Sequence, residues 1–189
     1  MPTSLSTTLN TAQRQAALIA INTRWLEQAY DLVARLDDRV YAASPAGFAP
    51  MRVGAHLRHI LEFYQCFLEG IENFHVDYDS RRRDLAVEQS RATAMSAVQS
   101  VLARLRSNPE LRGDCSIWVR MEDAGTAPEP FLTSTIAREL QALSSHTIHH
   151  FAMIAVTLRL HGVAVSADFG VAPSTLRYWS AQTAMAEAA

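Results

Sequence analysis

The chain contains no lysine, because all 17 of its Lys and Arg positions are arginine. This absence excludes Schiff-base chemistry, covalent attachment of pyridoxal phosphate and the phosphate-binding lysine of a P-loop. The seven glycines are scattered and never occur as Gly-x-Gly, so we expect no glycine-rich loop that cradles a nucleotide phosphate. The sequence therefore excludes several common cofactor classes.

Cysteine and long apolar runs are also scarce. Cys66 and Cys115 are too few for a disulfide framework or a zinc ribbon, and neither has a histidine at a spacing that favours a catalytic thiolate. No stretch reaches the roughly 18 uninterrupted apolar residues of a membrane span, and residues 1–13 lack the basic start and apolar run of a signal peptide. We therefore expect a cytoplasmic protein with no membrane partner.

Charge of one sign is not in excess either. The 17 basic residues face 19 acidic ones, the net charge is -2, and the arginines are spread along the chain apart from residues 81–83. This balance gives no support to nucleic-acid binding. With 189 residues, 49% of them hydrophobic, the chain fits one domain over 1–189, with a core at about 6–162 and a C-terminal extension at 163–189.

Apolar residues recur at three- and four-residue steps in four segments, which predicts helices at about 5–39, 52–74, 85–105 and from Ser134 or Thr135 to about 160. Four such helices in series predict an all-α protein, a four-helix bundle. On the first helix the pattern includes Leu18, Ile21, Trp25, Ala29, Leu32 and Leu36. On the second helix the residues expected to face the core are Val53, Leu57, Ile60, Leu61, Tyr64, Leu68 and Ile71.

The connecting segments carry weaker signals. Residues 75–84 are polar and charge-dense, which predicts a loop. Residues 116–120 suit a short strand, and 128–132 are its expected partner in a short β-hairpin before the last long helix. Beyond that helix, a short C-terminal helix is expected after Pro173, with Ser174 as its cap.

Five of the seven histidines fall in two short windows: His56 and His59 on the second helix, and His146, His149 and His150 on the fourth. Residues at i and i+4 share one helix face, so the imidazoles of His146 and His150 can reach one ion. Two imidazoles from one helix and one from another suit a late first-row divalent metal. The simpler alternative is that these histidines are hydrogen-bonded interior residues or lie at a partly solvated edge.

Helical angles sort the residues of the fourth helix. His146 and His150 border its apolar side, whereas His149 lies about 60° from His146 in the other direction. Glu139 shares the stripe of His146 two turns earlier, so it is a candidate to orient a ligand or to bind the ion itself. His75 and His161 fit surface or loop positions.

Two further features have a structural and a functional interpretation. On the second helix, Phe63 and Phe67 follow the histidines, and packing is their simplest role. In the run 77–84, Arg82 or Arg83 either belongs to a solvated loop or lies over the end of the bundle, where its guanidinium would hold a substrate carboxylate.

The sequence resembles the DinB-like superfamily, whose members are four-helix bundles with a histidine on the second helix and His-x-x-x-His on the fourth. Residues 54–63 (GAHLRHILEF) and 146–150 (HTIHH) carry the resemblance, which covers about 6–162. Residues 77–84, 138–140 and 169–178 add a likeness to one bacterial subgroup. The resemblance implies a nickel, zinc or iron ion held by His59, His146 and His150. His56 is the alternative to His59, although a histidine followed four residues later by an aromatic fits His59 with Phe63.

What the resemblance implies about activity is broad. Relatives include transferases that use bacillithiol or mycothiol, a mycothiol-dependent maleylpyruvate isomerase and the metal-binding domain of ergothioneine-synthesis enzymes. The first hypothesis is thus a metal-dependent thiol transferase or hydrolase that activates a low-molecular-weight thiol or water against a small electrophilic substrate. The alternatives are a non-catalytic bundle that binds a metal or small molecule and dimerises, and a dry core in which the histidines pair with Glu62 and Glu139. By analogy, we expect a homodimer.

Overall fold

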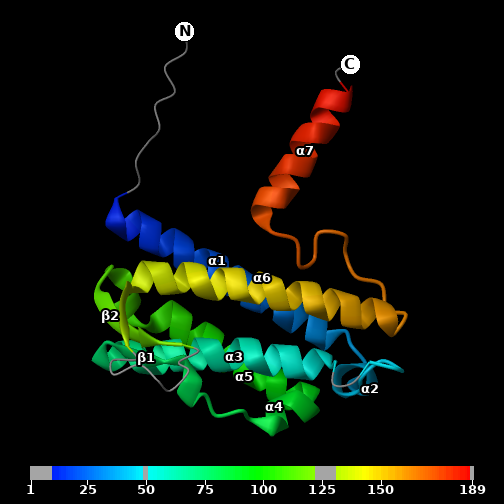
Figure 1. Ribbon diagram of the computed structural model, residues 1–189, viewed down its shortest axis with the longest axis horizontal. Helices are drawn as coiled ribbons and strands as arrows, with labels where there is room; N and C mark the ends of the chain where they lie inside the picture. Colours follow the sequence, from blue (N-terminus) through cyan, green and yellow to red (C-terminus); the bar gives the residue numbers. More distant parts are fainter. Residues whose placement is uncertain (1–9, 49–50, 122–130, 188–189) are drawn as a thin grey trace.

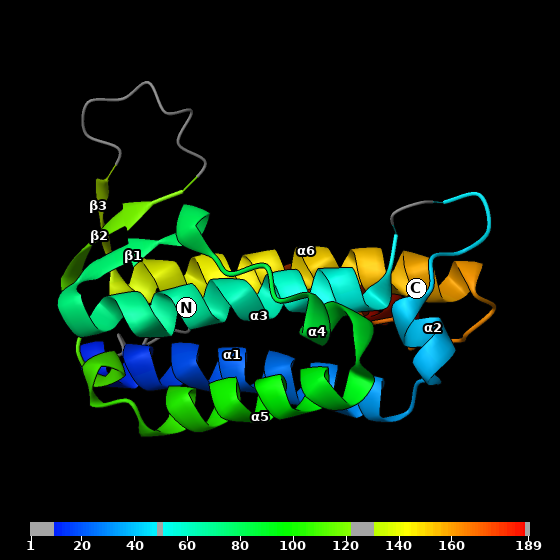
Figure 2. The same ribbon diagram turned by 90° about the horizontal axis from the view of Figure 1, so that it is seen from below.

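The computed structural model describes residues 10–48, 51–121 and 131–187. Its body consists of four long helices: α1 (Thr11–Ala34), α3 (Val53–Gly70), α5 (Arg91–Ser107) and α6 (Ile136–Leu160). Helices α1 and α3 each pack against both α5 and α6, so the four helices form a closed ring (Figures 1 and 2). The predicted four-helix bundle is confirmed.

The core lies inside this ring. The seven core residues predicted on the second helix are each no more than 1% exposed, which confirms that face of α3. On the first predicted helix, the periodic residues Leu18, Ala29 and Leu36 are buried, whereas Ile21 is 43% exposed. Leu26 and Val33, buried at 0% and 2%, complete the core face of α1.

Local caps end the predicted helices earlier than their apolar pattern does. Helix α1 begins after Asn10, which forms a capping box with Gln13, and ends at Ala34. The predicted continuation to residue 39 is interrupted by Asp37, whose side chain caps a separate short helix, α2 (Asp38–Ala42). Residues 5–9 of the predicted helix lie outside the described residues.

The second and third predicted helices are also divided. Helix α3 stops at Gly70 and is followed by one turn of 3-10 helix, η1 (Ile71–Asn73), and by Phe74 at a φ of 60°. The third prediction becomes α4 (Leu85–Gln89) and α5, because Ser90 adopts an extended conformation and its side chain accepts a hydrogen bond from the Thr93 amide. The apolar pattern across the break is nevertheless confirmed, since Val87 and Val98 are both buried.

A small sheet covers one end of the bundle. Strand β2 (Ser116–Arg120) is confirmed, but its partner is β3 (Leu132–Thr135) instead of the predicted 128–132, of which 128–130 lie outside the described residues. The two strands are antiparallel, with Ser116 opposite Thr135. The predicted loop at 75–84 is partly wrong, because β1 (His75–Asp77) pairs in parallel with β2, and η2 (Tyr78–Ser80) follows it. A further short turn of 3-10 helix, η3 (Pro109–Arg112), precedes β2.

The first residues of the last two helices can be compared with their predicted caps. The Thr135 side chain caps α6 by accepting a hydrogen bond from the Arg138 amide, as one of the two predicted caps. The last helix, α7 (Pro173–Glu187), begins at Pro173, so Ser174 lies within it. Figure 1 shows α7 leaving the bundle, while Phe169 before it stacks on Phe151 of α6 with ring centres 4.8 Å apart.

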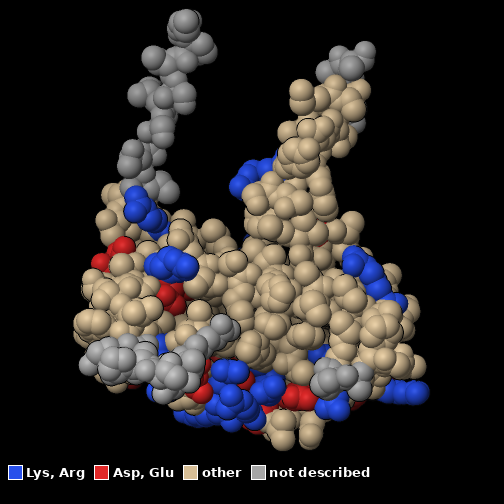
Figure 3. Space-filling model, in the orientation of Figure 1, with Lys and Arg blue, Asp and Glu red and all other residues tan. Residues whose placement is uncertain are grey.

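The surface shows no segregation of charge on the face drawn in Figure 3. Arginine and acidic side chains lie next to one another along the edge where α3 and α4 lie (Figure 3). Among the helices of the described residues, none combines the length and apolar character that crossing a membrane requires.

Candidate metal centre

The site is built where α3 and α6 pack side by side (Figure 2). His56 and His59 stand near the N-terminal end of α3, and His146 and His150 lie one turn apart in the middle of α6. All four side chains are partly buried. Packing of these two helices therefore brings together the two histidine windows that are far apart in the sequence.

His59, His146 and His150 converge on a common point. Each offers one ring nitrogen, and these three atoms lie within 4.8 Å of one another. The Nε2 atoms of His146 and His150 are 3.1 Å apart, and the ring centre of His59 lies 4.9 Å from that of His146 and 4.7 Å from that of His150. Metal–nitrogen bonds of about 2.0–2.1 Å allow two donors on one ion to be at most about 4.2 Å apart. The His146–His150 pair lies inside this limit, and a small rotation of the rings brings the whole set within it.

His56 lies on the other side of His150. Its Nδ1 is 3.1 Å from Nδ1 of His150, whereas Nε2 of His150 approaches His146. When Nε2 of His150 holds an ion, its Nδ1 carries the proton and donates it to His56. This geometry favours His59 as the third ligand and gives His56 the position of a residue that orients His150.

The three imidazoles are neutral at pH 7. Burial, followed by the charges of neighbouring histidines and of Arg81, lowers the pKa of His59 and of His146 to about 4. Burial, followed by His146, His56 and His149, lowers the pKa of His150 to about 3. Neutral imidazole is the form that binds a metal, so the donor set fits a late first-row divalent ion.

Aromatic rings form one wall of the site. Phe63 stacks on His146 with ring centres 4.2 Å apart, meets His59 edge-on at 4.8 Å and stacks against Tyr78 at 4.9 Å. Phe67 is fully buried in the core, as its packing role predicts. Phe63 therefore fixes the orientation of two imidazoles in addition to packing.

Arg81, which no sequence pattern distinguishes from Arg82 and Arg83, lies against the aromatic wall of the site. Its guanidinium carbon lies 5.7 Å from the ring centre of Phe63. Arg82 is 78% exposed in its side chain and donates to Glu69, and Arg83 sits at a φ of 52° in the same turn. Arg81 and Arg82 thus have different partners although they are adjacent, which no periodic pattern encodes.

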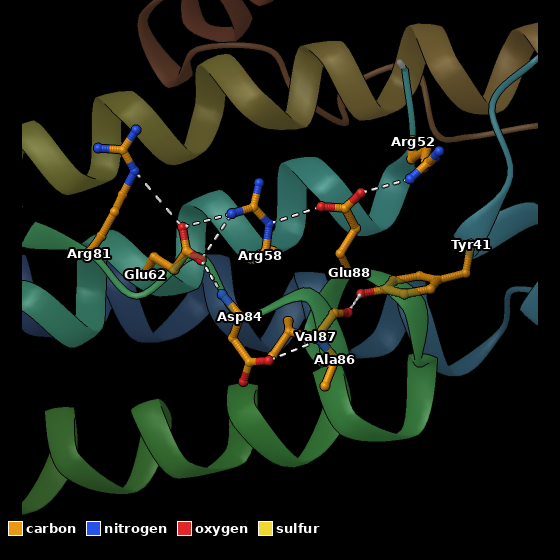
Figure 4. Close-up of polar contacts among 9 residues, drawn as sticks. All are labelled: Tyr41, Arg52, Arg58, Glu62, Arg81, Asp84, Ala86, Val87 and Glu88. Atoms are coloured by element: carbon orange, nitrogen blue, oxygen red, sulfur yellow. Dashed lines mark hydrogen bonds and ion pairs between the residues drawn. The ribbon is translucent and has the colours of Figure 1, made fainter. Parts of the chain in front are cut away.

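A chain of ion pairs holds Arg81 in place (Figure 4). Glu62, 2% exposed, accepts two hydrogen bonds from Arg58 and one from the Asp84 amide, and lies 3.9 Å from Nε of Arg81. Arg58 also donates to Glu88, which pairs with Arg52. The turn that carries Arg81 is therefore fixed to α3 by buried charges.

Glu139 lies in the site region but has its own partners. Its carboxylate is 6% exposed and accepts hydrogen bonds from the hydroxyls of Tyr78 at 2.9 Å and Ser134 at 2.6 Å. Glu62 is likewise held by arginines. The hydrogen bonds of the described residues thus do not pair the histidines with either glutamate, contrary to the dry-core alternative.

The remaining candidates are not among the three converging ligands. His149 is exposed at the edge of the site, with its ring centre 5.1 Å from that of His150. His75 is exposed, and His161 contacts the carbonyl oxygen of Ala43 at the end of α6. Burial, followed by neighbouring acidic charges, raises the pKa of Cys66 to about 11, and this thiol stays protonated at neutral pH. Both cysteines are free.

Two comparisons relate the chain to known proteins. A stretch of 105 residues is 31% identical to FK506-binding protein 5 of Rhizopus delemar; the match covers 54% of this chain and 27% of that protein. The chain thus spans only about a quarter of the relative's length. A sequence model of the DinB superfamily matches residues 21–154, more than half of the 189 residues and a range that includes His59, His146 and His150. The chain therefore belongs to the DinB superfamily.

Proposed function

We propose that the chain is a metal-dependent enzyme that brings a low-molecular-weight thiol or water to a small electrophilic substrate. His59, His146 and His150 hold a divalent nickel, zinc or iron ion. The observation that carries the proposal is the approach of three neutral imidazole nitrogens to within 4.8 Å of one another, from two helices. When bound, the ion supplies Lewis acidity that lowers the pKa of a thiol or water, so that a nucleophile exists at neutral pH.

The surrounding residues support this chemistry by orientation and access. His56 accepts the Nδ1 proton of His150 and fixes that ring with Nε2 toward the ligand set. Phe63 stacks on one face of the His146 ring and holds its orientation. His146 also borders an open surface depression with Arg138 and His149, through which a small molecule reaches the ligand set from solvent.

Metal analysis of histidine variants tests the proposal. We expect one equivalent of zinc, nickel or iron per wild-type chain, and its loss from His59→Ala and His146→Ala. His75→Ala, which removes an exposed histidine on β1, is the matched control and should keep the ion. Full metal retention by both site variants would end the proposal.

Turnover separates this function from a second candidate, a non-catalytic metal-binding bundle that dimerises. Helix α7 favours the second candidate, because Tyr178, Trp179 and Met185 are 61%, 49% and 70% exposed, as at an interface. Metal-loaded protein should accelerate attack of a thiol on a panel of electrophiles, and His59→Ala should not. Metal binding without turnover across the panel would favour the structural role.

The remaining proposals concern the protein's surroundings. We propose a homodimer, for which the exposed apolar residues of α7 are the support. We also propose a cytoplasmic location, which the two free cysteines support, because unpaired thiols persist in a reducing compartment.

A further inference from the structure

Three polar side chains meet inside the bundle and are fully buried. Asn22 on α1, Tyr64 on α3 and Thr147 on α6 are each 0% exposed. The hydroxyl of Tyr64 donates to Oδ1 of Asn22 at 2.7 Å, and its oxygen lies 3.2 Å from Oγ1 of Thr147. These three side chains, here called the core network, therefore join three helices through hydrogen bonds.

Every donor of the core network has an acceptor. The side-chain amide of Asn22 donates to the carbonyl oxygen of Leu18 at 2.8 Å and to that of Leu140, on α6, at 3.0 Å. The hydroxyl of Thr147 donates to the carbonyl oxygen of Leu143 at 2.7 Å. A shift of one helix along another would leave buried polar groups without partners, which is unfavourable. The network thus holds α1, α3 and α6 in one register.

Apolar contacts alone do not fix the register of helices so strictly. Hydrophobic cores accept different side-chain packing, and they lose a unique arrangement before they lose stability. Among the described residues, hydrogen bonds join side chains of α3 and α6 at two places, Tyr64 with Thr147 and His56 with His150. The second contact belongs to the histidine cluster itself. The first is therefore the polar contact through which the core sets the position of α3 against α6.

The core network lies beside the candidate metal centre. Thr147 directly follows His146 along α6, and Tyr64 directly follows Phe63 along α3. The ring of Phe63 in turn stacks on His146 with ring centres 4.2 Å apart. A shift of α3 along α6 would therefore disturb the network and the site together.

The ligand set is sensitive to this register because its members come from both helices. His59 belongs to α3, whereas His146 and His150 belong to α6. Functional groups of a site must be held to within about 0.5 Å of their productive positions. We propose that Tyr64 is a positioning residue, which through the core network holds α3 and α6 in the register that lets His59 share an ion with the other two histidines. The inference rests on the proposed function, since it assumes that these histidines bind a metal.

Two buried tyrosines provide a matched test. Tyr64→Phe removes the hydroxyl from the core network, whereas Tyr41→Phe removes an equally buried hydroxyl that donates to the carbonyl oxygen of Val87 in α4. Zinc affinity of the folded full chains is measured at pH 7 by competition with a chelator. We expect Tyr64→Phe to bind zinc about tenfold more weakly than the wild type and to change the visible spectrum of bound cobalt, which reports ligand geometry. Tyr41→Phe should do neither.

A second pair of variants keeps the test independent of the folding of Tyr64→Phe. Thr147 and Thr157 are both 0% exposed on α6, and each donates to the carbonyl oxygen four residues earlier. Thr147→Val should weaken zinc binding and Thr147→Ser should restore it, whereas Thr157→Val should leave it unchanged. Wild-type zinc affinity or an unchanged cobalt spectrum in Tyr64→Phe, or equal losses in the test and control variants, overturns the positioning role. Failure of the wild type to hold zinc instead overturns the proposed function, so the two failures are distinct.

Discussion

At the scale of single residues, burial decides the chemistry of the site. The imidazoles of His59, His146 and His150 share space with one another and with Phe63, and their pKa values fall below 6.5 because burial disfavours the charged form. Protonated imidazoles at this separation would also repel one another. The same packing that keeps the rings neutral thus prepares them to bind a cation.

The stability of the metal-free protein should therefore depend on pH. The folded pKa values of about 4 and 3 lie below the ordinary value of 6.5, so between these limits the unfolded chain binds more protons. The free energy of unfolding should be insensitive to these groups above pH 6.5 and should fall as the pH decreases from 6.5 toward 4. In urea titrations over this range, the unfolding free energy of His150→Gln should fall less steeply with decreasing pH than that of the wild type. The difference between the two slopes should correspond to at most about one proton taken up on unfolding. His75→Gln is the control, and identical slopes for all three proteins would contradict the account.

Arg81 and Arg82 offer a second prediction, because they are adjacent and carry the same charge. The charge of Arg81 lowers the pKa of His59 and His146, whereas Arg82 is exposed and pairs with Glu69. Arg81→Gln should therefore raise the pH at which bound zinc is half released, by roughly a few tenths of a unit, and Arg82→Gln should leave it unchanged. Release is followed with a colorimetric chelator. Equal shifts in both variants would show that only net charge matters.

The sequence predicts the histidine candidates but not the arrangement around them. Helical spacing identifies His146 and His150 as a pair on one face, and the structure places them together. Spacing cannot choose between His56 and His59, because both lie near the same stripe of α3; the packing of α6 separates them. It also cannot choose among three consecutive arginines, whose directions depend on a turn with Arg83 at positive φ.

At the scale of elements, close approaches of backbone set where the helices lie. A Cβ added to Gly54 would lie 2.0 Å from the carbonyl oxygen of Glu88 and 2.9 Å from the ring of Tyr41. The hydroxyl of Tyr41 donates to the carbonyl oxygen of Val87 at 2.6 Å. Absence of a side chain at Gly54 thus lets α4 reach α3, and this contact supports the charged network that holds Arg81.

Gly54→Ala should therefore be strongly destabilising. Separating α4 from α3 by the space of one methyl group is expected to cost about 1–3 kcal/mol of unfolding free energy. Gly113→Ala is the matched control, because its added Cβ meets only Sγ of Cys115 at 3.8 Å and its φ is -115°. That variant should change stability by less than about 0.5 kcal/mol in the same urea titration. A Gly54→Ala protein as stable as Gly113→Ala would contradict this interpretation of α4.

The presence of the long helices is predicted from the sequence more reliably than the residues at which they begin and end. Apolar periodicity continues from residue 85 to 105, yet Ser90 caps the amide of Thr93 and divides the segment. Asp37 does the same at the start of α2. Strand β1 has only three residues and pairs with a strand about 40 positions later, so no local pattern predicts it.

At the scale of the whole molecule, the sequence predicts four long helices but does not predict which of them pack against one another. The site requires α3 to lie against α6, and several arrangements of four helices would satisfy the same apolar patterns. The described bundle selects one of them by fitting the core residues together. Helix α7 takes no part in this ring, and Figure 1 shows it directed away from the other helices.

Helix α7 lies outside the ring of packed helices, so the bundle does little to stabilise it. It has 15 residues, and isolated helices of this length are marginal in water. Tyr178, Trp179 and Met185 would gain most from burial, and a second copy of the chain is the proposed partner.

Deletion of residues 173–189 should therefore change the mass measured by light scattering from that of a dimer to that of a monomer. The zinc content should stay unchanged, because Phe169 and the histidines remain. Trp179→Ser should weaken the dimer, whereas Gln182→Ser, a change to the same residue one turn away, should not. A full-length chain that is monomeric at all concentrations, or a truncated chain that remains dimeric, would show that α7 does not mediate dimerisation.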